Sequence, residues 1–141
     1  MLVRLMYVSR AVPALDAEEL HAILRSSRAR NPALGITGAL CYSDGIFVQV
    51  LEGGRSAVNR LYNQIVGDPR HSEVELLSYE EIGERRFAGW AMGQVNLQRL
   101  NPALLLKYSE TATLDPYAVS GAASKALFDE LVATAAIVGQ P

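Results

Sequence analysis

Apolar side chains recur along the chain with two different periods, one typical of strands and the other of helices. Residues 3–9 form a first β-rich run. A helix start at Asp16 and Glu19 then opens a segment with apolar positions every three or four residues, which we expect Pro32 to end. A second helical stripe covers residues 58–66. The pattern therefore predicts two helices within an otherwise strand-rich region.

Four further apolar runs predict strands around these helices. Residues 35–42 and 46–52 are joined by an Asp44-Gly45 turn, which is a strong signal for a β-hairpin. Residues 74–82 and 90–97 follow the second helix. The resulting order is strand, helix, strand, strand, helix, strand and one more strand. We therefore predict an α+β fold with a ferredoxin-like βαββαβ sheet, a fifth strand and both helices on one face.

The C-terminal part of the chain has a different pattern, which predicts a helical cap. Residues 101–108 indicate a short helix, residues 109–116 a connector, and residues 120–137 a longer helix with its apolar side chains on one side. Because the central strands are apolar on both faces, each face needs a cover. We therefore predict a domain over residues 1–97 and a C-terminal helical extension over residues 98–141, which caps the face opposite the first two helices.

A glutamine inside an apolar strand is the most informative polar position of the sequence. Burying the Gln49 amide without partners costs about 1–3 kcal/mol, so a polar group must face it. Strand periodicity places Gln49 on one face with Phe47 and Leu51. In a ferredoxin-like sheet the first and third strands are neighbours, so Tyr7 can meet Gln49 beneath the helices. The ordinary alternative is that both are core residues whose polar atoms find local partners, although buried glutamine is uncommon.

Other polar positions allow a structural as well as a functional interpretation. Asn31, next to a proline, is typical of a helix end or turn. Residues 68–71 have the composition of a solvated charged turn, although an arginine and a histidine at the mouth of a cleft can also hold a phosphate or a ribityl chain. Trp90 and Met92 are expected on one face of the last strand, where such side chains are more often core than cofactor wall.

Composition and charge exclude several classes of protein. With 141 residues, 50% of them hydrophobic, the chain fits one compact unit. Its 13 basic and 15 acidic residues leave a formal charge of -2, so we expect neither nucleic acid nor an anionic membrane as a partner. The single cysteine, Cys41, is expected to be a small buried hydrophobe. Since the sequence shows no signal-peptide pattern and no apolar run of ~20 residues, we expect a cytoplasmic location and no membrane span.

The sequence contains no motif of a common enzyme class. His21 and His71 are far apart and the chain has one cysteine, so metal-ligand spacing is absent. Dinucleotide, P-loop and serine-hydrolase glycine motifs are absent too. The residues alone therefore favour binding or electron transfer, and a small-molecule-sensing ferredoxin-like regulatory domain is one alternative. An acylphosphatase-like hydrolase would need an anion-cradling loop near the first strand, for which residues 9–13 are a poor candidate.

Several sequence blocks, taken together, resemble the BLUF domain, a blue-light sensor that uses flavin. The resemblance covers about residues 2–97 with all blocks in order, and residues 104–109 resemble the short single-domain members of the family. The blocks are Arg4-Leu5-Met6-Tyr7-Val8-Ser9, Asn31-Pro32, Gly35-Ile36-Thr37-Gly38, Phe47-Val48-Gln49-Val50-Leu51-Glu52-Gly53, Asp68-Pro69-Arg70-His71 and Arg86-Phe87-Ala88-Gly89-Trp90-Ala91-Met92.

The resemblance implies a photochemical role for two residues and a relay role for two others. Tyr7 corresponds to the tyrosine that gives an electron and then a proton to the photoexcited flavin, and Gln49 to the glutamine that changes its hydrogen bonds. Asn31 corresponds to the residue that holds the pyrimidine edge of the isoalloxazine. Trp90 and Met92 correspond to the pair whose arrangement relative to the pocket changes with light.

The same resemblance implies further flavin contacts, in the slot between the helices and near the polar tail of the flavin. Gln64 departs from the family pattern, because relatives often carry Arg or His there toward the flavin O2, so this contact is neutral in the present chain. The positions implied are Ile23, Ser27, Ile36, Gln64, Asp68, Arg70 and His71.

The resemblance therefore predicts a blue-light photoreceptor that binds FAD non-covalently, with FMN or riboflavin as other candidate flavins, and that has no catalytic turnover. It predicts signalling through contact with a downstream protein, for which a response-regulator-like protein is one candidate. We also expect the protein to form a homo-oligomer.

Overall fold

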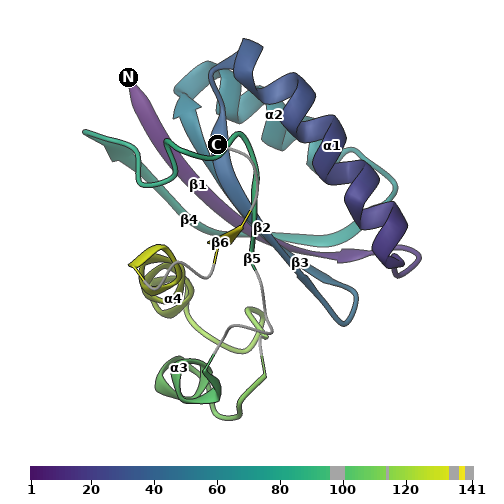
Figure 1. Cartoon of the computed structure of the whole chain (residues 1–141), viewed down its shortest axis with the longest axis vertical. Helices are drawn as coiled ribbons and strands as arrows, with labels where there is room; N and C mark the ends of the chain where they lie inside the picture. The colour runs from purple at the N-terminus through teal and green to yellow at the C-terminus, as the bar shows by residue number, and fades with distance from the viewer. Residues whose placement is uncertain (96–100, 114, 134–136, 139–141) are drawn as a thin grey trace.

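The computed structural model describes residues 1–95, 101–113, 115–133 and 137–138 of the chain. Its strands form one sheet, and its helices form two pairs that pack on the sheet (Figure 1). In chain order they are β1 (Leu2–Ala11), α1 (Ala17–Leu34), β2 (Thr37–Ser43), β3 (Ile46–Gly54), α2 (Arg55–Val66), β4 (His71–Ile82), β5 (Gly93–Val95), α3 (Pro102–Tyr108), α4 (Gly121–Ala133) and β6 (Ile137–Val138).

The sheet has the predicted topology. Its strands lie in the order β4-β1-β3-β2-β5-β6, so β1 and β3 are central neighbours. The first four strands pair antiparallel, and β5 joins β2 in parallel, which makes the sheet mixed. Helices α1 and α2 cover one face, and α3 and α4 lie on the other side (Figure 1). The predicted ferredoxin-like fold with a helical cap is confirmed.

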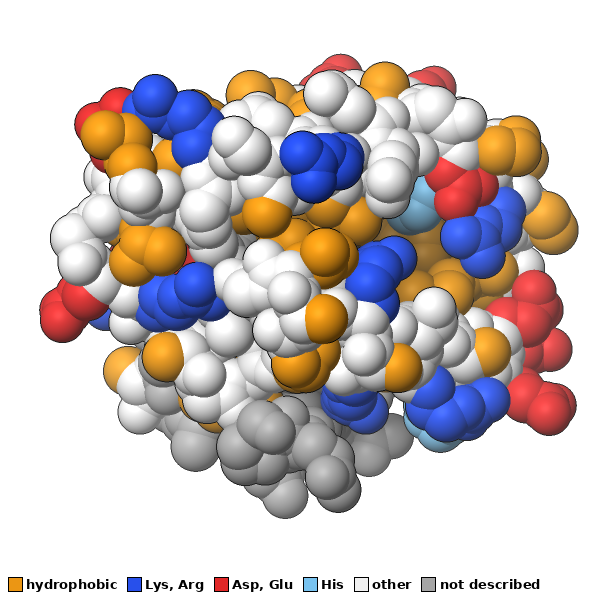
Figure 2. Space-filling model, turned by 90° about the horizontal axis from the view of Figure 1, so that it is seen from above, with side chains coloured by type: hydrophobic (Ala, Val, Ile, Leu, Met, Phe, Trp, Pro, Cys, Tyr) orange, Lys and Arg blue, Asp and Glu red, His pale blue; other side chains and the backbone are white. Residues whose placement is uncertain are grey.

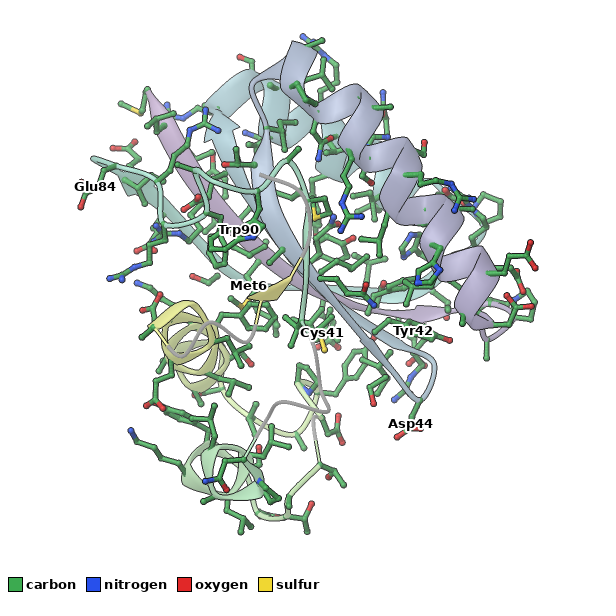
Figure 3. The ribbon with its side chains drawn as sticks, in the orientation of Figure 1. Met6, Cys41, Tyr42, Asp44, Glu84 and Trp90 are labelled. Carbon is green, nitrogen blue, oxygen red and sulfur yellow. The ribbon has the colours of Figure 1, made fainter. Side chains whose placement is uncertain are left out.

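The sheet separates two apolar clusters. Leu5 and Leu51 belong to the cluster beneath α1 and α2, which we call the helix face, whereas Met6 and Val50 belong to the cluster against α3 and α4, which we call the cap face. Successive side chains of a strand point to opposite faces, so each central strand contributes to both clusters. Figure 3 shows Met6 and Cys41 on the side of the sheet that faces α4.

Helix α1 begins as predicted but ends later. Asp16 and Glu19 form a reciprocal capping box at its start. The prediction that Pro32 ends the helix was wrong, because Pro32 lies within it. The fixed φ of proline is helical, so in the last turn proline removes one N–H from the helix without forcing the chain out of it. The helix ends at Gly35, whose φ of 67° is left-handed and whose N–H bonds back to the carbonyls of Asn31 and Pro32.

Two predicted elements near the C-terminus have different bounds. The fifth strand begins at Gly93 rather than at residue 90, and residues 96 and 97 lie outside the described residues. The predicted helix over residues 120–137 ends at Ala133 in the structure, and residues 137–138 form β6, which pairs with β5. Residues 134–136 lie outside the described residues, as does the predicted domain boundary at residue 97. That boundary therefore stays a prediction.

The cap packs closely on the edge strand β4. A Cβ atom on Gly121 would lie 1.9 Å from the carbonyl oxygen of Leu77, so only glycine allows the start of α4 to approach β4 this closely. Leu127, Phe128 and Leu131 of α4 are buried in the cap-face cluster. The cap is therefore part of the core and not a loosely attached extension.

Candidate functional site

A hollow of about 420 Å³ lies between α1, α2 and the helix face of the sheet. Figure 2 shows it from the side of the two helices: apolar side chains form its floor, and a histidine with acidic and basic groups lies at its rim. Its volume is within the usual range for sites that bind small molecules or cofactors. On this face the strands therefore leave a cavity that α1 and α2 do not fill.

Tyr7 and Gln49 form the polar part of the floor. The two residues lie directly opposite each other in the β1–β3 register, and both side chains line the hollow. The Tyr7 hydroxyl donates a hydrogen bond to Gln49 Oε1, and both residues are buried. The predicted meeting of phenol and amide beneath the helices is confirmed as geometry.

The other end of the Gln49 amide has a weaker partner. Gln49 Nε2 lies 3.4 Å from the sulfur of Met92, and a thioether is a weak hydrogen-bond acceptor. The oxygen of the amide is thus held by a hydroxyl, while its nitrogen faces a soft, replaceable acceptor. This asymmetry lowers the cost of rearranging the hydrogen bonds of Gln49.

Burial controls the protonation of Tyr7. Loss of solvent raises the pKa of the phenol far above its usual range, and the nearby phenol of Tyr62 raises it further. The Tyr62 ring lies 5.7 Å from the Tyr7 ring, centroid to centroid. The cationic Arg30 lowers the pKa of Tyr7 but does not offset burial. Tyr7 therefore stays protonated in the ground state and has a proton to donate.

Charged groups lie at the mouth of the hollow. Arg70 Nη2 lies 2.7 Å from Asp68 Oδ2, and this pair lowers the pKa of Asp68 to about 2. His71 Nδ1 lies 2.8 Å from Ser9 Oγ, and burial lowers the pKa of His71. The mouth therefore combines a carboxylate, a guanidinium and a largely neutral imidazole, a set that can bind a polar or phosphorylated tail.

The structure brings most of the predicted flavin contacts together around the hollow. Asn31 and Ile36 are exceptions: both are buried in the structure but neither lines the hollow. Asn31 Nδ2 instead donates to the carbonyl of Ala91 at 2.7 Å. Flavin contact stays a prediction for all of the predicted residues, whether or not they line the hollow. The predicted residues that line the hollow are Ile23, Ser27, Gln49, Gln64, Asp68, Arg70 and His71.

Trp90 and Met92 do not share one face of a strand as predicted. They precede β5, and Met92 is buried in the helix-face cluster, whereas Trp90 packs with Phe87 against the cap-face cluster. The Trp90 and Phe87 ring centroids are 6.5 Å apart. The prediction was wrong because residues 90–92 form an irregular segment before β5, so strand alternation does not apply to them; this segment contacts β2 through the carbonyl of Trp90, which accepts from the N–H of Gly38.

Arg30 and Glu52 are among the residues at or near the site that were not predicted. Arg30 lines the hollow, and its spacing of three from Ser27 and seven from Ile23 on the same helix is a signal that could have found it. Glu52 is fully buried three positions after Gln49, on the cap face. Buried polar side chains are rare in an apolar strand, and a buried carboxylate such as Glu52 is rarer than a buried amide such as Gln49.

The side chains around the hollow suit an organic cofactor rather than a metal. Within the described residues there is no cluster of histidine, cysteine or carboxylate groups that could hold a metal ion. The walls combine apolar and polar side chains, with an amide and a phenol at the floor and charges at the mouth, which fits an aromatic ring system with a polar tail. In the same part of the chain no helix is long and apolar enough to cross a membrane.

A ferredoxin-like sheet with an internal phenol–amide pair under two helices defines a cofactor-binding sensor domain, and comparison with known proteins supports this class. The family model described as BLUF, sensors of blue light using FAD, matches residues 2–93. The chain belongs to this family, whose members are flavin-binding sensors of blue light.

Individual relatives agree with the family assignment. The photoactivated adenylate cyclase subunit beta of Euglena longa is 41% identical over 92 residues, which are 64% of this chain and 11% of the cyclase. The chain thus spans about a tenth of this curated relative. The solved structure of BlsA in its photo-activated state is 32% identical, with a TM-score of 0.82 over 100% of this chain and 99% of that one. BlrB, a BLUF protein in its dark state, is 37% identical, with a TM-score of 0.73 over 96% and 95% of the two chains.

Proposed function

We propose that this protein is a blue-light photoreceptor in which Tyr7 and Gln49 form the light-driven switch. The observation that carries the proposal is the hydrogen bond from the buried Tyr7 hydroxyl to Gln49 Oε1 at the floor of the hollow. Two core residues with no function could form the same hydrogen bond. Tyr7 and Gln49, however, face a cavity rather than packed side chains. The pair is therefore accessible to a bound ring.

A flavin bound in the hollow supplies a chromophore that absorbs blue light and becomes a strong oxidant when excited. Tyr7 would donate one electron to the bound ring, and its phenolic proton would follow along the hydrogen bond to Gln49 Oε1; both would then return to the Tyr7 phenol, so that no net oxidation remains. Because the phenol stays protonated in the ground state, electron and proton leave the same residue. Oxidation makes the phenol far more acidic, which favours transfer of the proton toward the amide.

Gln49 then adopts a second hydrogen-bond arrangement, by rotation or by tautomerisation of its amide. An amide exchanges donor and acceptor ends with little change in shape, and only the weak contact to the Met92 sulfur opposes this exchange at the nitrogen. The new arrangement changes the hydrogen bonding of Gln49 toward the hollow. The expected signature is a red shift of the flavin absorption.

The residues around the hollow divide into two flavin-binding groups. Ile23 and Ser27 of α1 and Gln64 of α2 line the slot between the helices, and Arg70 and His71 lie at its mouth near the polar tail. We propose FAD as the flavin, with FMN and riboflavin as alternatives, since all three share the ring that the slot receives. The neutral Gln64 gives a weaker contact than the Arg or His that relatives often carry.

The output of the sensor is proposed to be a change in protein–protein contact without catalytic turnover. The cap face, with α3 and α4, is the part of this domain that carries the change outward to a downstream protein or to a second copy of the chain. Such signalling requires only that the domain has two packed states and that light changes their relative populations.

The test is the absorption spectrum of purified protein with FAD in darkness and under blue light. We expect a yellow protein with a reversible red shift, and we expect Gln49→Leu to keep the flavin but lose the shift. A preparation that takes up no flavin, or a flavin-bound protein without any light response, would contradict the proposal. The second of these outcomes would favour the alternative of a ligand-binding regulatory domain without photochemistry.

A further inference from the structure

One loop connects the two faces of the sheet. This crossing loop, residues 83–92, leaves β4 and enters β5, with Phe87 buried in the cap-face cluster and Met92 in the helix-face cluster. Its last residue touches Gln49, while its middle packs against the residues of the cap. In Figure 3, Glu84 and Trp90 mark the beginning and the later part of the crossing loop. The crossing loop therefore links the contact at Gln49 with the cap face in a single covalent segment.

Backbone contacts fix the last part of the crossing loop near the site. Asn31 Nδ2 donates to the carbonyl of Ala91 at 2.7 Å, and Arg28 Nε donates to the carbonyl of Met92 at 2.9 Å. Both donors come from α1, which also forms one wall of the hollow. The position of Met92 beside Gln49 is thus set by α1 at one end of the crossing loop.

The other end of the crossing loop is held by Glu52. This carboxylate is 0% exposed, and its two oxygens accept from the backbone N–H groups of Arg86 at 2.9 Å and Phe87 at 2.7 Å. Arg4 adds its Nε and Nη2 groups to Glu52 Oε2, both at 2.8 Å. Four donors on one buried carboxylate form a fixed anchor rather than an exchangeable contact.

Ion pairs continue from this anchor to α4. Arg4 Nη1 lies 2.9 Å from Glu80 Oε1, and Lys125 Nζ lies 2.9 Å from Glu80 Oε2. A second link joins Arg86 Nε to Asp129 Oδ1 at 3.2 Å. The first series of ion pairs begins at Glu52 and the second at Arg86, whose N–H bonds to Glu52. Both series end on α4.

We propose that Glu52 is a positioning residue of the light switch, which holds the crossing loop between Gln49 and α4 so that a change at Gln49 moves α4. This inference rests on the proposed photoreceptor function and names the residue through which that function reaches the cap. The described side-chain hydrogen bonds and ion pair of Glu52 go to Arg4, Arg86 and Phe87, none of which lines the hollow, so it acts through the crossing loop and through Arg4.

The chemistry of the anchor explains why a carboxylate is used. A buried ion pair is weak evidence for stability, because removing two charges from water offsets most of their attraction. Its effect is instead on placement: a carboxylate can accept from two adjacent N–H groups and a guanidinium at once, which an amide with one oxygen cannot do. Replacing Glu52 by Gln therefore loosens the crossing loop with little change in side-chain volume.

The experiment measures amide hydrogen exchange in α4, dark and illuminated, in flavin-loaded wild type, Glu52→Gln and Glu81→Gln. Glu81 is the control, because it is also a strand glutamate paired with an arginine, Arg55, but its side chain is 59% exposed and this ion pair involves no residue of the crossing loop. We expect light to change exchange in α4 by about fivefold or more in wild type and Glu81→Gln, the low end of known couplings between sites. We expect Glu52→Gln to keep the flavin red shift but to lose most of the change in α4.

The outcomes separate this inference from the proposed function. A wild-type protein without a red shift contradicts the proposed function itself. A normal red shift with an equal α4 response in wild type and Glu52→Gln, or with no α4 response in wild type, overturns only the role of Glu52.

A second pair of variants keeps the test decisive should Glu52→Gln fail to fold. Lys125→Met and Asp129→Asn each remove one partly exposed link on α4. Together they should reduce the α4 response while leaving the red shift of the flavin unchanged. An undiminished response in the double variant overturns the proposal.

Discussion

Two buried polar residues on one strand, Gln49 and Glu52, show how differently the two faces of the sheet are built. Gln49 faces a hollow and has one hydroxyl and one sulfur as partners. Glu52 faces a packed core and accepts from four donors. The helix face thus holds its amide loosely enough to rearrange, whereas the cap face holds its carboxylate in place. The same strand carries a switch on one side and an anchor on the other.

The two faces should differ most in how much stability is lost when a phenylalanine is truncated to alanine. Phe87→Ala on the cap face should lower the free energy of unfolding by about 3–5 kcal/mol, because it leaves a cavity in a closed core. Phe47→Ala on the helix face is the matched variant and should cost less in flavin-free protein, since Phe47 already borders a hollow. Urea unfolding of both variants measures this, and equal losses would refute the contrast between faces.

Removing the Tyr7 hydroxyl should have the next largest effect on stability and the decisive effect on function. Tyr7→Phe leaves Gln49 Oε1 without its donor, which costs about 1–3 kcal/mol in the free energy of unfolding. We expect the variant to bind flavin and to lose the reversible red shift. Tyr62→Phe is the control, because Tyr62 lies beside Tyr7 but makes no bond to Gln49 in the described hydrogen bonds. A normal shift in Tyr7→Phe removes Tyr7 from its role.

The sequence predicts the switch better than the anchor. Strand periodicity and strand order were enough to bring Tyr7 and Gln49 together, because both rules act within regular elements. The same rules placed Trp90 and Met92 on one strand face, where the structure has a loop held by long-range bonds to Gly38 and Asn31. Contacts between distant backbone groups have no local signal in sequence.

Other misses have the same physical origin. The local sequence predicts that Pro32 ends the helix. In the structure α1 ends at Gly35, which adopts the left-handed conformation. Strand β6 depends on pairing with β5 across a long separation in sequence, so residues 137–138 were assigned to a helix.

A smaller effect should distinguish the two methionines on the two faces. Met92→Leu keeps side-chain volume, so its cost in unfolding free energy should stay below about 1.5 kcal/mol. It removes the sulfur that Gln49 Nε2 faces in the dark arrangement, so the red-shifted state should live longer after illumination. Met6→Leu makes the same change on the cap face, away from Gln49, and should leave the lifetime unchanged. Equal lifetimes in wild type and Met92→Leu would show that the sulfur contact is irrelevant to recovery.

The smallest expected effect is a pH dependence from the mouth of the hollow. Burial lowers the pKa of His71, so in a range below about pH 6.5 the unfolded chain binds a proton that the folded chain does not. Stability should therefore fall as the pH drops through this range. His71→Gln should flatten the dependence. Unfolding free energies at several pH values measure it, and an unchanged slope in His71→Gln would contradict it.

The most direct test of the central claim is a light-minus-dark infrared difference spectrum of flavin-loaded protein with isotope-labelled glutamine side chains. The claim that the Gln49 amide changes its hydrogen bonds predicts a label-sensitive carbonyl band that appears on illumination and disappears in Gln49→Leu, but persists in Gln94→Leu, a change at a glutamine outside the hollow. A light-induced red shift without any label-sensitive band, or with a band that survives in Gln49→Leu, would contradict the account.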